Sequence, residues 1–340
     1  MIDMSLQSEP VMLPGRPFGR TVRSIAGYSL LTALMMRSEL TVFIPAMMIH
    51  SAIRNGRRAT WIMLAAATLV GFALFAITPA SALEMKQTFS FLAVSVLAIA
   101  LPAMLALPMI ERGEAFGRVL MVMLLGSACG LGLVELGARA VASFSPYALI
   151  LSEAKVAGAE LAKTYAASGM PASAVSFAQR WSNYYSTVLL PGALLLTNAI
   201  SFVLSLMMIG RLRAWFEFAE KRSITAPGAY LFRNFSLPDW VLFAFILGGV
   251  APLVKGTLHM IAANMLMVAV FLYVLQGFAL LRFLLASAGV GFIGALFAFG
   301  FTLITGVGPM LLGVAGLFDP FFDFRHYKKR KDDSHEGHSD

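Results

Sequence analysis

Charged side chains are scarce in this sequence: they make up 13% of its 340 residues, against roughly 25% in a typical soluble domain. Hydrophobic residues make up 59%, and the mean hydropathy is +0.78. A single soluble core cannot bury that much apolar surface. The scarcity of charge therefore excludes a soluble enzyme and a disordered chain, and it leaves a helical protein that crosses a membrane several times.

Cysteine and the common catalytic motifs are also missing. The one cysteine, Cys129, lies in an apolar stretch, so an intramolecular disulfide and a cysteine-based metal site are excluded. The sequence has no GxxxxGK[ST] phosphate-binding loop, no HExxH zinc motif and no GxSxG nucleophile motif. We therefore expect a protein that is not an enzyme, holds no cofactor or metal, and does not itself hydrolyse ATP through such a loop.

Basic residues are in excess, 26 against 18 acidic ones, for a net charge of +8. They gather in short loops between apolar runs, which is the positive-inside pattern of membrane proteins rather than a sign of nucleic-acid binding. The clusters lie at 54–58 and 210–237, and four apolar runs separate them. Because four is even, we expect both loops on the cytoplasmic side of a bacterial inner membrane.

Runs of about 20 apolar residues predict the membrane helices. The clear runs are 60–79, 88–110, 116–136, 187–209, 239–254 and 257–281. Region 24–53 carries Arg37 and Glu39 at its middle and is expected to be broken, for instance near Pro45. Region 284–318 is either one long tilted helix or two short ones, and the C-terminus is on the cytoplasmic side if it is two.

The expected fold is an all-α polytopic transmembrane helical bundle with about eight or nine membrane segments. Amphipathic helices are expected in the segment between its two membrane halves. The parts are a polar N-terminal tail (1–23), N-terminal membrane helices (24–136), an extracytoplasmic amphipathic segment (137–186), C-terminal membrane helices (187–325) with the basic loop 210–237, and a disordered charged tail (326–340).

Helical periodicity marks the non-membrane parts. A stripe at spacings of three and four predicts one helical face that contacts the bundle or the outer leaflet, or forms a lid over an outward-facing site. Its members are Ile150, Ala154, Ala157, Leu161 and Tyr165. A second helix is expected over 172–181, after a stop at 169–171. In the basic loop, Trp215, Phe216 and Phe218 alternate with arginines and lysines, which predicts an interfacial helix beside anionic lipid.

Polar residues within apolar runs are costly and so are candidates for function. Asn198, His259, Asn264 and Gln276 could line one polar cavity for a small solute, or could form hydrogen bonds between helices. A lipid-modifying enzyme would need paired ionisable groups at one depth, and Glu135 and His259 are the residues that could supply them.

Four motifs in order carry a family resemblance: LPDW at 237–240, Asn264, LQGFA at 275–279, and GLFDPFFDFR at 316–325. Over about 187–325 the sequence resembles the YybS-like family of uncharacterised bacterial membrane proteins. The layout of that family is distantly similar to the substrate-binding membrane subunits of energy-coupling-factor vitamin transporters, and also to a membrane component of the rod-shape machinery. The resemblance implies a multi-pass protein without an established activity.

The last motif places Asp319, Asp323 and Arg325 at the end of the final apolar run. We expect these charges to pair outside the membrane and anchor the helix at a fixed depth, or to form a docking surface for a partner. Two functions stay open. One is binding or transport of a small solute with a separate energising protein. The other is a structural or assembly role that recruits proteins to the basic loop and the tail. Both place the chain in a lipid bilayer, and neither involves nucleic acid.

Overall fold

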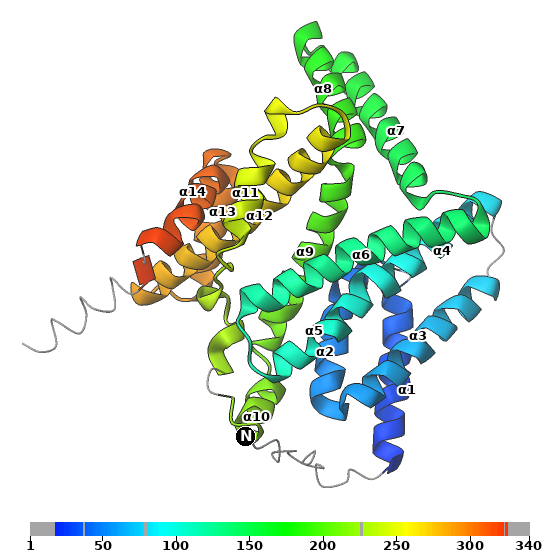
Figure 1. The fold of residues 1–340 in the computed structure, drawn as a ribbon, viewed down its shortest axis with the longest axis vertical. Coiled ribbons are helices and arrows are strands. Elements are labelled where there is room, and N and C mark those ends of the chain that lie inside the picture. Colours follow the sequence, from blue (N-terminus) through cyan, green and yellow to red (C-terminus); the bar gives the residue numbers. More distant parts are fainter. Residues whose placement is uncertain (1–17, 37, 78–80, 225–226, 323, 326–340) are drawn as a thin grey trace, which may run out of the picture.

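The computed structural model describes residues 18–36, 38–77, 81–224, 227–322 and 324–325, and these are organised as helices joined by short turns (Figure 1). The first six α-helices are α1 (Phe18–Met35), α2 (Ile44–Asn55), α3 (Arg57–Ile77), α4 (Ala82–Val94), α5 (Leu101–Glu111) and α6 (Phe116–Ala142). They are followed by α7 (Pro146–Ala167), α8 (Ala172–Tyr184), α9 (Leu190–Ile209), α10 (Arg213–Lys221), α11 (Val241–Gly248), α12 (Gly256–Ser287), α13 (Phe292–Ile304) and α14 (Val307–Phe322).

The helices that are long and apolar enough to cross a membrane are fewer, in the described part of the chain, than the segments that the sequence predicts. Among the described residues, five stretches are long and apolar enough: Arg57–Leu74, Leu83–Glu111, Phe116–Ala142, Ala172–Ile209 and Gly256–Ser287. The pair α13–α14, bent by 109°, raises the count to six at most. The predicted eight or nine segments are thus not confirmed. The reason is length, because Val22–Met35, α2 and Val241–Leu253 are shorter than the about 20 residues that a bilayer core requires.

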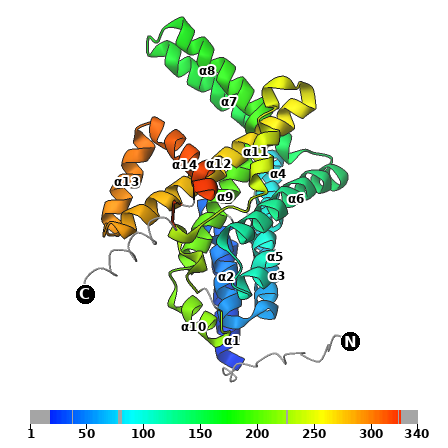
Figure 2. The same ribbon diagram turned by 60° about the vertical axis from the view of Figure 1, so that its left-hand side comes forward.

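Both ambiguous apolar regions are broken. In the first, α1 ends at Met35 and α2 begins at Ile44, with Pro45 in its first turn, where a missing N–H removes no helical hydrogen bond. In the second, α13 ends at Ile304, and the chain turns at Gly306. The φ of Gly306 is +63°, a value that is unfavourable for residues other than glycine. Helix α14 then returns to the middle of α12 (Figure 2).

Helices α7 and α8 form a hairpin that projects from the bundle (Figures 1 and 2). Two helices are present where two were predicted, and the residue of α7 that packs closely against α8 lies beside the predicted stripe. Ala157 and Leu161 are exposed, whereas Gly158 faces α8 so closely that a Cβ there would lie 1.6 Å from Ser182 Oγ. The close approach of the two helices therefore selects a small residue at 158, and the contact of the predicted stripe with the bundle or the outer leaflet stays a prediction.

The α8 helix continues through a π-helical turn, Tyr185–Leu189, into α9. Together they form one apolar stretch of 38 residues, Ala172–Ile209. At 1.5 Å per residue this stretch is about 57 Å long, well beyond the roughly 30 Å of a bilayer core. One part of the stretch therefore has to lie outside the hydrocarbon region.

The basic loop is folded onto the bundle rather than spread along lipid. Trp215, Tyr230 and Phe235 are fully buried, and the rings of Trp215 and Tyr230 meet edge to face at 5.0 Å. The Tyr230 hydroxyl donates to the Glu114 carbonyl at 3.0 Å. The expectation of an interfacial helix is thus wrong for Trp215, because α10 packs it against α2, and only Phe216 stays exposed.

The two basic loops lie at one end of the molecule. The Glu111 carboxylate accepts hydrogen bonds from Arg57, in the first basic cluster, and from Arg222, in the second. A residue from the C-terminal segment contacts the second of these loops, because the Arg325 guanidinium donates to the carbonyls of Arg233 and Phe235 at 2.9 and 2.8 Å. The end of α14 therefore lies on the same side as the loop 210–237.

Candidate functional site

The four residues predicted to share a cavity lie at three places, with His259 and Asn264 at one of them, and each residue has protein partners. Asn198, in the middle of α9, donates from Nδ2 to Ser127 Oγ of α6 at 2.8 Å, and both side chains are buried. This is a hydrogen bond between two helices, as is common within membranes. The prediction of one polar cavity lined by these residues is therefore corrected, and the interhelical alternative describes Asn198.

Asn264 of α12 forms hydrogen bonds with backbone groups at the junction between α8 and α9, where the helix is irregular. Pro191 has no N–H, and the π-helical turn before it leaves carbonyls without their usual partners. Asn264 Oδ1 accepts from Gly192 N, and its Nδ2 donates to the carbonyls of Val188 and Met260, all at 2.6 Å. The amide thus fixes the first turn of α9 to α12.

His259 lies one turn and a half before Asn264 and makes a second link to the same junction. Its Nδ1 is 2.8 Å from the Ala251 carbonyl, and its Nε2 is 3.1 Å from the Tyr184 hydroxyl. A carbonyl only accepts, so Nδ1 carries the proton and Nε2 accepts from the tyrosine. Both ring nitrogens are therefore engaged, and the structure places no contact between His259 and Glu135.

Gln276 belongs to a buried network at the other end of α12. Its Oε1 accepts from Leu237 N at 3.1 Å, and its Nε2 donates to Asp319 Oδ2 at 3.3 Å. The same Asp319 oxygen pairs with Arg325 Nη2 at 3.0 Å. Among the described residues, Asp319 Oδ1 and Arg325 Nε have no hydrogen-bond partner.

This network corrects the prediction for the final motif. Asp319 and Arg325 do pair, but Asp319 is buried between α12 and α14 instead of lying outside the membrane as an anchor or docking surface. The burial follows from Gly277 and Gly316, which allow the two helix backbones to approach closely. Asp323, the third residue of the prediction, lies outside the described residues.

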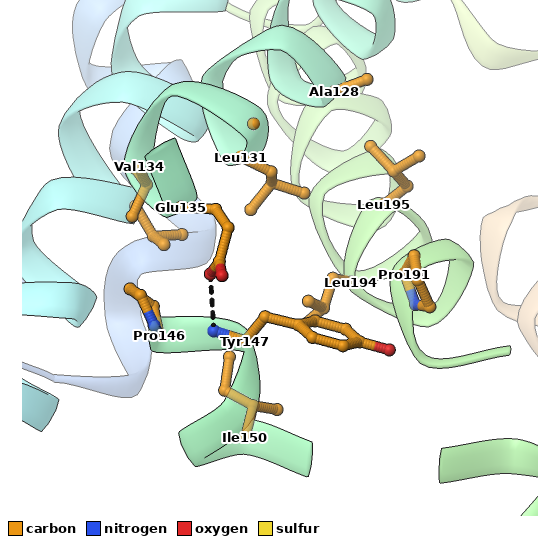
Figure 3. A pocket seen from close by; sticks show the side chains of 12 residues that line it. Ala128, Leu131, Val134, Glu135, Pro146, Tyr147, Ile150, Pro191, Leu194 and Leu195 are labelled. Carbon is orange, nitrogen blue, oxygen red and sulfur yellow. Dashed lines mark hydrogen bonds between the residues drawn. The ribbon is translucent and has the colours of Figure 1, made fainter. Parts of the chain in front are cut away.

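A cavity of about 270 Å³ lies elsewhere, between α6, α7 and α9, and is partly open to the surface (Figure 3). We call it the α6–α9 cavity. Most of its lining is apolar: Val94, Ala128, Leu131, Gly132, Val134, Pro146, Ile150, Pro191, Leu194 and Leu195. Glu135 and Tyr147 supply its polar groups. Its volume is just below the roughly 300–1,000 Å³ of typical small-molecule sites.

The turn between α6 and α7 places Glu135 at this cavity. Ser143 ends α6 in a left-handed conformation, and Ser145 caps α7 by accepting from Ala148 N at 3.0 Å. Glu135 Oε1 accepts from Arg139 Nε at 2.6 Å and from Ser145 Oγ, and its Oε2 accepts from Tyr147 N at 2.9 Å. The carboxylate therefore holds the first turn of α7 against α6.

The Tyr147 ring extends from the Glu135 side of the cavity toward Pro191 (Figure 3). Partial burial, together with the nearby negative charge of Glu135, raises the pKa of the Tyr147 phenol. The phenol is therefore neutral at physiological pH, and it offers a hydroxyl and an aromatic face. In the described part of the chain, no basic side chain lines this cavity.

Glu135 is recognisable in the sequence as a polar residue in an apolar run, but the cavity beside it is not. Tyr147 carries no signal of its own in the sequence, because it lies outside the predicted membrane helices and reaches α9 only through the α6–α7 turn. Within the described ranges, no group of three or more His, Cys, Asp or Glu residues is arranged to hold a metal ion.

Comparison with known proteins gives one match. No curated protein and no solved structure matches the chain. A family model described as "Predicted membrane protein (DUF2232)" matches residues 31–320, which includes both membrane halves and the hairpin between them. The chain therefore belongs to the DUF2232 family of predicted membrane proteins.

Proposed function

We propose that this chain is a non-enzymatic membrane protein that binds a small solute in the α6–α9 cavity and takes part in moving it across the membrane. The observation that supports this is the cavity itself: a concave, mostly apolar site with two convergent polar groups, which is the usual form of a small-molecule site. The polar residues first predicted to bind solute have another role, because Asn264 positions the α9 wall of the cavity through Gly192.

A separate energising protein forms part of this proposal, since the sequence has no P-loop of its own. We place the chain in the bacterial inner membrane with loops 54–58 and 210–237 in the cytoplasm. Support comes from the excess of basic residues in both loops and from Glu111, which joins them at one end of the molecule. The contacts of Arg325 with the loop 210–237 support the same side for residue 325.

The likeness to the YybS-like family, and through it to vitamin-transporter subunits, is part of the same proposal. It is an analogy of layout, so it supports the class of function rather than a particular solute.

Filling the cavity tests the proposal. Gly132 lines the cavity, and a Cβ added there meets nothing within 4 Å, so Gly132→Phe projects a ring into the space without a backbone clash. Gly137 lies on the same helix with equally open surroundings but does not line the cavity, so Gly137→Phe is the matched control. The readout is native mass spectrometry of each protein, gently extracted from its own membrane.

A small mass retained by the parent protein and by Gly137→Phe, but lost from Gly132→Phe, is the expected result. Retention of the same mass by Gly132→Phe would place the ligand elsewhere and contradict the proposal. The absence of any small mass from the parent protein would count against solute binding.

A structural or assembly role is the second candidate. It is favoured by an exposed aromatic stripe on the projecting hairpin, formed by Phe177, Trp181 and Tyr185 at successive intervals of four residues. The test is co-purification of a partner protein with the parent chain, with Gly132→Phe and with the double variant Phe177→Ala/Trp181→Ala. A partner that is retained by the first two and lost from the double variant would favour this role over solute binding.

A further inference from the structure

The walls of the α6–α9 cavity carry charge of one sign. Leu131, Leu194 and Leu195 supply apolar surface, and Glu135 is the one ionisable acid or base among the lining residues apart from the Tyr147 phenol. An anion placed here would face the Glu135 carboxylate, and none of the lining residues is a cation. Since Coulomb energies grow as the surroundings become less polar, an apolar wall strengthens that repulsion.

Arg139 does not cancel the Glu135 charge inside the cavity. It lies one helical turn further along α6, is not part of the lining, and its side chain is 62% exposed. It contacts Oε1, whereas Oε2 accepts only from Tyr147 N among the hydrogen bonds of the described residues. A solvent-exposed ion pair is weak and easily exchanged. The carboxylate therefore keeps capacity to attract a second cation from the cavity side.

Tyr147 adds a second group that favours positive charge. Its ring lies along the cavity between Glu135 and Pro191 (Figure 3), and an aromatic face attracts a cation within about 6 Å of its centre. The hydroxyl makes no hydrogen bond to another described residue. Carboxylate, aromatic face and apolar wall thus surround one small space.

We propose that the ligand of the α6–α9 cavity is a small organic cation with an apolar body, such as a substituted ammonium ion. The inference rests on the proposed function, because it names the chemical class of the solute bound there. The positive group lies between Glu135 and the Tyr147 ring, and the apolar body packs against the leucines of α6 and α9. A partly apolar cation releases its water more easily than a small metal ion, so it loses less on entering such a site.

Three probes of similar shape and different charge test the class. They are benzyltrimethylammonium, its neutral carbon isostere neopentylbenzene, and the anion 3-phenylpropionate. Binding is measured by equilibrium dialysis of the protein in lipid nanodiscs, and empty nanodiscs give the partitioning into lipid that has to be subtracted. We expect the cation to bind about tenfold more tightly than the neutral isostere, and the anion not to bind.

Substitutions assign the effect to the two polar groups. Glu135→Gln keeps an oxygen that accepts from Tyr147 N, so the α6–α7 turn is retained while the charge is lost. It should weaken cation binding about tenfold and leave the neutral isostere unchanged. Tyr147→Leu keeps apolar bulk without the ring and should also weaken the cation selectively. Glu160→Gln is the control, because Glu160 is an exposed acid on α7 outside the cavity.

The outcomes separate the inference from the function on which it rests. Equal binding of the cation and the neutral isostere, both lost in Gly132→Phe, would overturn the charge preference and leave the cavity as a solute site filled by apolar groups or acyl chains. Preferential binding of the anion would also overturn the inferred preference for a cation. Binding of none of the three probes, or binding unaffected by Gly132→Phe, would overturn both the inference and the proposed function.

Discussion

Asp319 and Glu135 are both carboxylates paired with an arginine a few positions further along the chain, yet their surroundings differ. The Asp319 side chain is 6% exposed and that of Arg325 is 18% exposed, whereas Glu135 and Arg139 are 22% and 62% exposed. The first pair is enclosed by α12, α14 and the loop 233–237. The second borders the α6–α9 cavity.

The difference shows how one type of pair can serve two purposes. A buried pair contributes little net stability, but the loss of one partner leaves an uncompensated charge and is costly. Asp319 therefore keeps the last helix in place and has little capacity for a new ligand. A half-exposed pair is weak, and its charges can be shared with another ion. Glu135 is thus suited to binding, and the following changes test the contrast.

The largest effect is expected from Asp319→Ala. It leaves the Arg325 guanidinium buried without its counter-ion and removes the acceptor of Gln276, so the free energy of unfolding should fall by about 3–5 kcal/mol. Unfolding in detergent by denaturant measures this. The double substitution Asp319→Leu/Arg325→Met removes both charges and should recover most of the loss. A double variant as unstable as the single one would contradict the buried-charge explanation.

A smaller loss, about 1–3 kcal/mol, is expected from Gly277→Ala. A Cβ at 277 would lie 2.0 Å from the Leu312 carbonyl oxygen, so α14 has to move away from α12 and carry Asp319 away from Gln276. Gly300→Ala in α13 is the matched control, because its Cβ meets nothing within 4 Å and alanine favours a helix. Similar stability of the two variants in thermal unfolding would argue against the tight α12–α14 contact.

At the cavity, Glu135→Gln should change the free energy of unfolding by less than about 1 kcal/mol, because the lost ion pair is partly exposed and the amide oxygen still accepts from Tyr147 N. The corresponding change at the buried site, Asp319→Asn, should cost more, since Arg325 then keeps an unpaired charge. Equal losses in the two variants would remove the contrast between the pairs.

The smallest effect is expected on the pH dependence of the free energy of unfolding, to which the phenols of Tyr230 and Tyr147 contribute. Burial, with a contribution from Glu114, raises the pKa of Tyr230 well above its ordinary value of about 10. Above pH about 10 the unfolded chain releases this proton and the folded chain keeps it. Stability should therefore fall with rising pH, by at most about 1.4 kcal/mol per unit from this residue.

Tyr230→Phe should reduce that slope in unfolding experiments between pH 9 and 11. Tyr147→Phe should reduce it less, because Tyr147 is only partly buried. An unchanged slope in Tyr230→Phe would show that its phenol titrates equally in the folded and unfolded chains.

Much of the layout was predictable because it depends on local properties. Pro45, Gly306 and the stop at 169–171 mark breaks that are present in the structure. The predicted count of membrane segments is not confirmed, since an apolar run of 12 or 13 residues resembles a span in composition but lacks the length.

The candidate site was not predictable to the same degree. Polar residues in apolar runs were recognised, but their partners were not, because those partners are distant in sequence. Asn264 meets Gly192 72 positions away, and Asn198 meets Ser127 71 positions away. The burial of Trp215 is not predictable from its neighbours in the sequence either, because it depends on contacts with Tyr230 and α2, which are distant along the chain.

The sequence by itself determined that this protein is helical, apolar and built for a membrane, because hydropathy, helix length and turn residues act over short distances. Only the tertiary structure decided which polar groups are enclosed and which border a cavity. That choice depends on how closely helices approach. Gly277 and Gly316 let α14 bury Asp319, whereas the α6–α7 turn leaves Glu135 beside open space. The same pairing of acid and arginine therefore stabilises the fold at one site and remains available to a ligand at the other.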